Sequence, residues 1–211
     1  MLTKRQNMIE TMRGGNPDRF VNGHEALAIV RNSSPYMKEF PRPRRGEEPR
    51  VNGWGVLIQF PEGVPGAFPV HDEEHILLKD IEHWRDIVKA PELNYTEEDW
   101  ADAAAEAAAI DRNEYFVTFM VAPGIFEQCH ELMSMVGALT AFAEYPDEMH
   151  ELIDYITEFE LKCSNSQTHS STPARTISSR ASIRAETTLS GIRASVVISP
   201  AGTSSAKKES S

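Results

Sequence analysis

Cysteine is scarce in this chain of 211 residues, and long apolar runs are absent. The two cysteines, Cys129 and Cys163, stand 34 positions apart with no CxxC pair, so the sequence predicts no disulfide framework and favours a reducing compartment. The longest strongly apolar run, residues 115–126, is too short to cross a bilayer, and the polar start of the chain shows no leader pattern. We therefore expect a cytoplasmic protein with no membrane partner.

Three common catalytic and nucleotide-binding motifs are also missing. The sequence has no GxSxG, no GxxxxGKS and no GxGxxG, so hydrolase and nucleotide-binding readings lack support. Basic residues are few, because residues 1–163 hold 15 Lys and Arg against 30 Asp and Glu. Such acidity argues against nucleic acid as a partner. The one dense basic run, residues 42–45, is expected to be a solvated loop.

The composition changes sharply after residue 163. Residues 164–211 contain 14 Ser and 6 Thr among 48 residues and no Asp, Phe, Tyr, Trp or Met. A segment of this kind cannot bury enough apolar surface to offset its ordering entropy, so we expect a folded domain over 1–163 and a disordered tail over 164–211. The change interrupts a helical pattern, which suggests out-of-frame translation from about Cys163. A native Ser/Thr-rich tail is the alternative.

Apolar spacing and turn signals predict the following elements. Thr3 and Gln6 form a capping box before a helix over 4–13, which ends at Gly14. A continuous apolar run over 115–121 is typical of a strand buried on both faces of a parallel sheet. Short strands are expected at 20–21 and 56–60, and helices at 73–89, 97–110, 126–133, 138–144 and 147–162. Helix, strand, turn and helix in this order indicate an α/β fold.

Polar residues near the predicted strands are the first candidates for chemistry. Glu127 comes just after the strand over 115–121, and ligands of parallel α/β folds bind at that end. A glutamate that only suits the first turn of its helix is the alternative. Glu127 and His130 have the spacing of di-iron sites, and His71 and His75 lie four apart, but each pattern occurs singly. Trp54 either stacks on an aromatic substrate or fills the core.

Several segments together resemble one protein family. A capped entry helix through Gly14-Gly-Asn-Pro-Asp-Arg19, a strand leading into a Pro-Gly turn over 116–125, and the helices over 138–155 are similar to the uroporphyrinogen decarboxylase superfamily. The segments 52–55, 63–66 and 69–72 resemble most closely the branch of corrinoid-linked methyltransferases that demethylate aryl methyl ethers. The likeness covers residues 1 to about 162. It implies the N-terminal portion of a (β/α)₈ TIM-type barrel, incomplete in this chain.

The resemblance also implies a reaction and a site. In the methyltransferase branch a corrinoid on a partner protein accepts the methyl group, and a proton donor or a Lewis acid such as zinc assists the departing oxygen of a small-molecule substrate. The expected catalytic residues are His24, Glu25 and Glu127, and the expected substrate contacts are Asn22, Trp54 and Phe126. No residue is assigned to a metal, and no cofactor is assigned to this chain itself.

Two other functions stay open at this point. True uroporphyrinogen decarboxylases carry an arginine-rich run after the first strand that binds substrate carboxylates, whereas the corresponding stretch here, residues 22–26, contains no arginine. Porphyrinogen decarboxylation is therefore the alternative enzymatic reading. A non-catalytic acidic α/β interaction module is the third.

Overall fold

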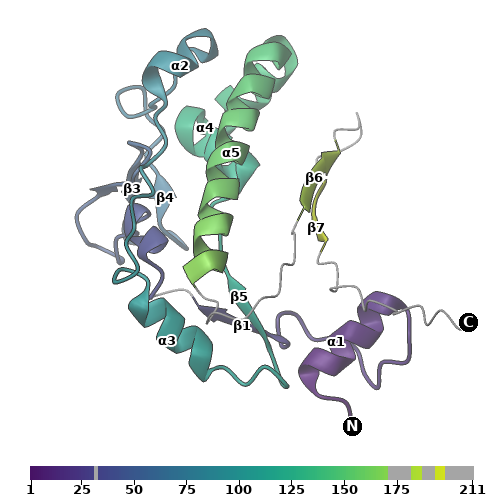
Figure 1. The fold of residues 1–211 in the computed structure, drawn as a ribbon. Coiled ribbons are helices and arrows are strands. Elements are labelled where there is room, and N and C mark those ends of the chain that lie inside the picture. Colours follow the sequence, from purple (N-terminus) through teal and green to yellow (C-terminus); the bar gives the residue numbers. More distant parts are fainter. Residues whose placement is uncertain (31–32, 171–181, 187–192, 198–211) are drawn as a thin grey trace, which may run out of the picture. The chain divides into compact units, whose positions relative to one another are not determined.

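The chain combines helices with three small sheets, and Figure 1 shows their order in a computed structural model. The structure describes residues 1–30, 33–170, 182–186 and 193–197. Two compact units divide the chain, Met1–Thr172 and Pro173–Ser211. The first unit is mixed α/β, as the sequence predicts. The second unit contains strands β6 (Ser182–Glu186) and β7 (Arg193–Val197), which pair antiparallel.

The chain begins with helix α1 (Lys4–Arg13), whose bounds confirm the sequence prediction. The Thr3 side chain accepts from the Gln6 amide, the Gln6 side chain accepts from the Thr3 amide, and Gly14 ends the helix with a positive φ of 64°. Asn7 is fully buried on the inner side of α1, where its side-chain amide bonds the backbone of Asp18 and Arg19. These bonds fix the loop that follows the helix.

Two parallel strands, β1 (Leu27–Val30) and β5 (Phe116–Phe119), pair in the register Leu27 opposite Phe116. The strand expected over 115–121 is thereby confirmed, whereas the strand expected at 20–21 is wrong. Phe20 is 97% exposed, and two apolar residues are too few to cover a sheet. Helix α3 (Ala101–Ala109) lies between the two strands in the chain and packs against Val30 through Trp100 and two alanines.

A second sheet occupies the long excursion between β1 and α3. It joins β2 (Arg50–Val51), β3 (Leu57–Gln59) and β4 (Phe68–Pro69) as an antiparallel sheet, and β3 confirms the strand expected over 56–60. The Asn52 side chain accepts from the amides of Trp54 and Val56, both at 3.0 Å, and so holds the turn that brings Trp54 into the core.

The helix expected over 73–89 is wrong. Only the short 3₁₀ helix η2 (Ile81–His83) and helix α2 (Trp84–Ile87) form there. Asp72 accepts from the amides of Glu74 and His75, and Asp80 accepts from the amide of Glu82, so two aspartates divert backbone donors into separate turns. The next predicted helix, over 97–110, is shorter than expected because Thr96 and Asp99 first form a turn of their own.

Two long helices, α4 (Ile125–Glu144) and α5 (Pro146–Ser170), pack side by side (Figure 1). Ser134 has a φ of 71° and kinks α4, which separates the two helices that the sequence predicts there. Phe126 and Phe142 have ring centroids 6.1 Å apart, whereas a straight helix would separate them by about 24 Å. The kink therefore folds the second half of α4 back toward the first.

Helix α5 continues beyond the change of composition at residue 163. Residues 164–170, the first part of the predicted tail, belong to this helix. Apart from β6 and β7, the rest of the predicted tail lies outside the described residues. The prediction that these residues are disordered or translated out of frame therefore stays a prediction.

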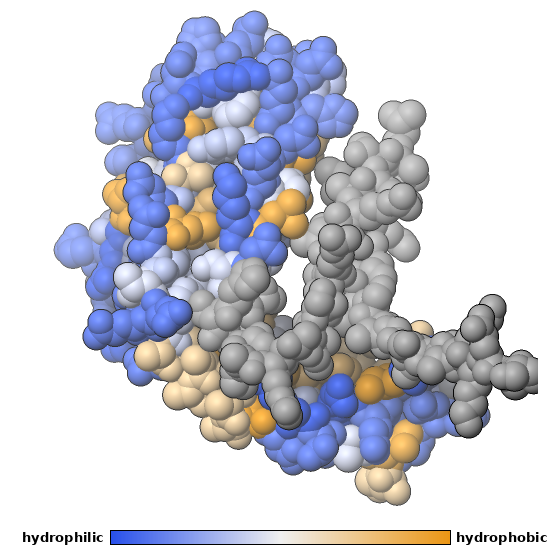
Figure 2. All heavy atoms as spheres, viewed as in Figure 1, coloured by the Kyte–Doolittle hydropathy of each residue, from blue (hydrophilic) through white to orange (hydrophobic). Residues whose placement is uncertain are grey.

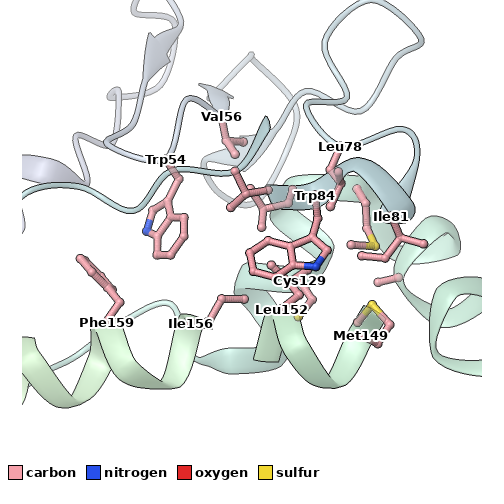
Figure 3. Packing of buried hydrophobic residues seen from close by; sticks show 14 of the residues in the cluster. Trp54, Val56, Leu78, Ile81, Trp84, Cys129, Met149, Leu152, Ile156 and Phe159 are labelled. Atoms are coloured by element: carbon pink, nitrogen blue, oxygen red, sulfur yellow. The ribbon is translucent and has the colours of Figure 1, made fainter. Parts of the chain in front are cut away.

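The main core lies between α5 and the segments that follow β1 (Figure 3). Figure 3 shows the apolar stripe of α5 facing the indoles of Trp54 and Trp84, and the rings of Trp54 and Phe159 meet edge-on at 5.0 Å. The sequence pattern of α5 predicts that burial of this stripe stabilises the packing of the helix on the core. The stripe consists of Met149, Leu152, Ile156, Phe159 and Cys163.

The surface is mostly hydrophilic, with apolar side chains between the charged ones (Figure 2). Met135, Val136 and Leu139 are exposed just after the kink of α4. Within the part of the chain that the structure describes, no helix is both long and apolar enough to cross a membrane.

Candidate functional site

The candidate site lies at the carboxyl ends of β1 and β5. Because the two strands are parallel, the segments that follow them emerge at the same edge of the sheet. The 3₁₀ helix η1 (Pro35–Glu39) follows β1, and the turn over 122–124 follows β5. The Tyr36 hydroxyl donates to the Ala122 carbonyl oxygen at 2.6 Å and ties these two segments together.

The turn after β5 lets the carboxylate of Glu127 lie close to the backbone of Gly124. Ala122 and Pro123 are joined by a cis peptide bond, and Gly124 has a φ of 110°. A Cβ at Gly124 would lie 3.0 Å from Oε2 of Glu127, so the glycine leaves room for this carboxylate to fold back over the turn. The Gln128 amide donates to the Gly124 carbonyl and starts α4. Glu127 therefore stands exposed at the first turn of α4, where the sequence predicts it.

Glu160 on α5 is the carboxyl group with the most unusual environment at this edge. Burial, and then the negative charge of Glu127, raise the pKa of Glu160 to about 7. An ordinary glutamic acid ionises near pH 4.5, so this one keeps its proton for a large fraction of the time at neutral pH. Such a group is suited to donate or accept a proton in catalysis.

A third carboxylate, Glu131, lies one turn along α4 from Glu127. Its side chain is 7% exposed, and burial raises its pKa, whereas the guanidinium of Arg42 at 4.0 Å opposes that rise. A partner of opposite charge thus compensates Glu131, while Glu160 faces another acid. We call Glu127, Glu131 and Glu160 the carboxyl cluster.

Aromatic and imidazole rings adjoin the carboxyl cluster. Phe126 lies 5.8 Å from the ring of His130, and the rings of His71 and His130 stand 6.4 Å apart, edge to face. Nε2 of His71 lies 3.1 Å from the Glu131 carbonyl oxygen. Burial and then the neighbouring His71 lower the pKa of His130, so its ring is predominantly neutral at pH 7. These rings give the edge a partly apolar wall.

Two other expected catalytic residues, His24 and Glu25, and the expected substrate contact Asn22 lie at the opposite end of the sheet. Asn22, His24 and Glu25 precede β1, because the strand forms over 27–30 and not at 20–21. Asn22 and His24 are exposed, and the Glu25 carboxylate lies 3.9 Å from Nε of Arg19. The structure therefore brings Phe126 and Glu127 to the carboxyl end, but it does not bring Asn22, His24 or Glu25 to them.

Trp54, an expected substrate contact, lies in the main core. It is 3% exposed and packs edge-on against Tyr155 and Phe159. Its indole nitrogen has no hydrogen-bond acceptor among the described residues. The packing alternative that the sequence left open for Trp54 is the one observed.

Sequence reasoning missed three residues of this site, Tyr36, Glu131 and Glu160. Glu160 lies four residues after Ile156, next to the apolar stripe of α5. An acidic residue at such a position in the sequence indicates a buried or functional carboxyl group. Tyr36 gives no such signal, because an aromatic residue after a proline is common in loops and cores alike.

The metal readings find little support in the donor geometry. Across the described residues, no three His, Cys, Asp or Glu side chains come together as a metal ion would require. His75 bonds Asp72 within its own turn, and both cysteines are buried, which raises the pKa of each thiol to about 12. The described residues do not fit the zinc ion that the resemblance implies.

Comparisons of the chain with family models, with curated proteins and with solved structures found no match.

Proposed function

We propose that the chain is an enzyme of the uroporphyrinogen decarboxylase superfamily, in the corrinoid-linked methyltransferase branch. In this proposal β1 and β5 are neighbouring strands of a (β/α)₈ barrel, with α3 as the helix between them. Their parallel pairing and the packing of α3 on β1 support it. So does the Pro-Gly turn that follows β5.

The proposed reaction removes a methyl group from an aryl methyl ether. The carbon–oxygen bond breaks and its electron pair stays on the oxygen, while the methyl group would pass to a corrinoid protein, the second substrate, whose Co(I) would supply the electron pair of the new bond. Glu160 gives its proton to this oxygen as the bond breaks, so a phenol leaves and Glu160 is left as a carboxylate. The observation that carries this role is the partly buried carboxyl of Glu160, which the charge of Glu127 influences and whose pKa is raised to about 7.

Glu127 has a supporting electrostatic role in this proposal. Its negative charge disfavours ionisation of Glu160 and so keeps the donor loaded. Phe126 and His130 supply a ring-lined wall against which an aryl group can pack.

Porphyrinogen decarboxylation is the less supported reaction. Residues 22–26 contain no arginine, and a substrate with many carboxylates would meet the carboxyl cluster at the other end of the sheet. Like charges at this edge favour a neutral substrate. An aryl ether satisfies that requirement.

The test is methyl transfer from a panel of aryl methyl ethers to a reduced corrinoid protein. We expect Glu160→Gln to lower kcat by about 10²- to 10⁴-fold with little change in KM, since a proton donor acts mainly in the transition state. His24→Ala, at the other end of the sheet, is the matched control and should stay within about twofold of wild type. Absence of transfer from every ether, or full turnover by the Glu160 variant, would refute the proposal.

A further inference from the structure

Tyr36 contacts the turn that leads into α4, the helix of Glu127, and also contacts α5, the helix of Glu160. Its hydroxyl bonds the Ala122 carbonyl in the turn before α4, two residues from Gly124, against which Glu127 rests. Its ring packs at 6.2 Å from Phe159, the neighbour of Glu160 on α5. The side chain is 1% exposed, so these contacts have little freedom to rearrange.

Further contacts hold the tyrosine in place. The Phe40 ring lies 4.9 Å away on the same segment, and Cys163, one turn of α5 after Glu160, is a neighbour of the tyrosine. Burial raises the pKa of the Tyr36 hydroxyl, so it stays protonated and remains a donor to Ala122. The hydrogen bond therefore persists across the pH range in which Glu160 titrates.

Two carboxylates on different helices repel each other in a partly buried site. Other contacts must therefore keep the two helices together. Helices α4 and α5 are joined mainly by apolar contacts, which resist separation but do not fix the turn that leads into α4. The bond from Tyr36 to Ala122 fixes that turn directly, and the ring contact relates it to α5.

We propose that Tyr36 is a positioning residue that sets the separation of Glu127 and Glu160 by bonding the Ala122 carbonyl while packing against α5. This inference rests on the proposed function only for its catalytic meaning, since the positioning is a property of the folded chain. The titratable groups that face Glu160 are Glu127 and Cys129 of α4, Tyr36 of η1, and Cys163 of its own helix.

The test follows the carboxyl carbon of Glu160 by ¹³C NMR titration of the full chain, assigned with Glu160→Gln. In Tyr36→Phe the ring remains but the bond to Ala122 is lost, so we expect the midpoint of Glu160 to fall by about half a pH unit as Glu127 moves away. The matched control is Tyr155→Phe. Tyr155 lies on α5, the helix that carries Glu160, and the substitution removes a hydroxyl that accepts from the Ala90 amide. Its midpoint should equal that of wild type.

A double variant separates positioning from general loosening. In a Glu127→Gln background, Tyr36→Phe should change the midpoint no further, because the charge that Tyr36 positions is already gone. Equal falls in both backgrounds would show that Tyr36 only keeps water out, and no fall in either would show that it positions nothing. Each result would overturn the inference.

A second variant guards against loss of folding in Tyr36→Phe. Cys163→Ala leaves the tyrosine intact but removes its neighbour on α5, and we expect a smaller fall of the midpoint that also vanishes in the Glu127→Gln background. An unchanged midpoint with Glu127 present would contradict the role of α5. None of these titrations uses methyl transfer, so they can succeed even where the proposed reaction fails.

Discussion

The two ends of the β1–β5 sheet surround their acidic residues with opposite charges: a base at the amino end and another acid at the carboxyl end. At the amino end, Glu25 lies beside Arg19, and α1 covers the neighbouring backbone through the bond from the Arg5 amide to the Glu114 carbonyl. At the carboxyl end, Glu160 is partly buried and its nearest charged influence is another acid, Glu127.

In the proposed function, the amino end is structural and the carboxyl end is where the chemistry takes place. An acid beside a base has its charge compensated, whereas burying an acid beside a like charge lowers stability and changes its pKa. Folds retain such arrangements mainly at functional sites. The comparison predicts that variants at the two ends will affect stability, pH dependence and chemistry differently.

The largest expected effect concerns the packing that supports the carboxyl end. Trp54→Ala should lower the free energy of unfolding by about 3 to 5 kcal/mol, because a buried indole that packs on Phe159 is replaced by a cavity. Phe20→Ala, at the amino end, should change it by less than about 0.5 kcal/mol because that ring is exposed. Urea unfolding followed by fluorescence and circular dichroism measures both, and equal losses would contradict the comparison.

A smaller effect is expected where hydrogen bonds support the amino end. Asn7→Ala leaves the Asp18 amide and the Arg19 carbonyl without their buried partner, at a cost of about 1 to 3 kcal/mol. Faster hydrogen exchange of the Asp18 amide should accompany this loss. Asn22→Ala removes an exposed amide of the same type and should leave stability and exchange as in wild type.

The smallest predicted effect is a pH dependence that belongs to the carboxyl end alone. The folded chain binds the proton of Glu160 more tightly than the unfolded chain does, so its contribution is fully present below pH 4.5 and is lost as pH rises toward 7. Partial exposure screens this term, which leaves about 1 to 2 kcal/mol. Unfolding of wild type and Glu160→Gln at pH 5 and pH 8 measures it, and an equal pH dependence in both would contradict its source.

Local sequence signals predicted those elements that local interactions determine. The capping box at Thr3 and Gln6 fixed the start of α1, and the stripe from Met149 to Phe159 predicted most of α5. The apolar run that became β5 was equally clear, and it placed Glu127 correctly after the strand. In each case the residues that decide the structure are neighbours in the chain.

The errors arose where distant residues decide. The strand β1 forms over 27–30 because its backbone pairs with β5, some 90 positions later, and this moved His24 and Glu25 to the other end of the sheet. The segment after Asp72 has apolar residues that suit a helix, yet aspartate side chains take its amides and the Leu78 amide bonds Leu132 of α4. Glu160 escaped notice because its acid neighbour lies 33 positions away.

The most direct test of the central claim is the titration of the Glu160 carboxyl carbon in the full chain. This partly buried acid should titrate near pH 7 in wild type, and Glu127→Gln should shift its midpoint downward because the neighbouring charge is removed. A midpoint near 4.5 in both proteins would show that Glu160 is an ordinary surface acid. The two ends of the sheet would then be alike, and the proposed proton donor would be lost.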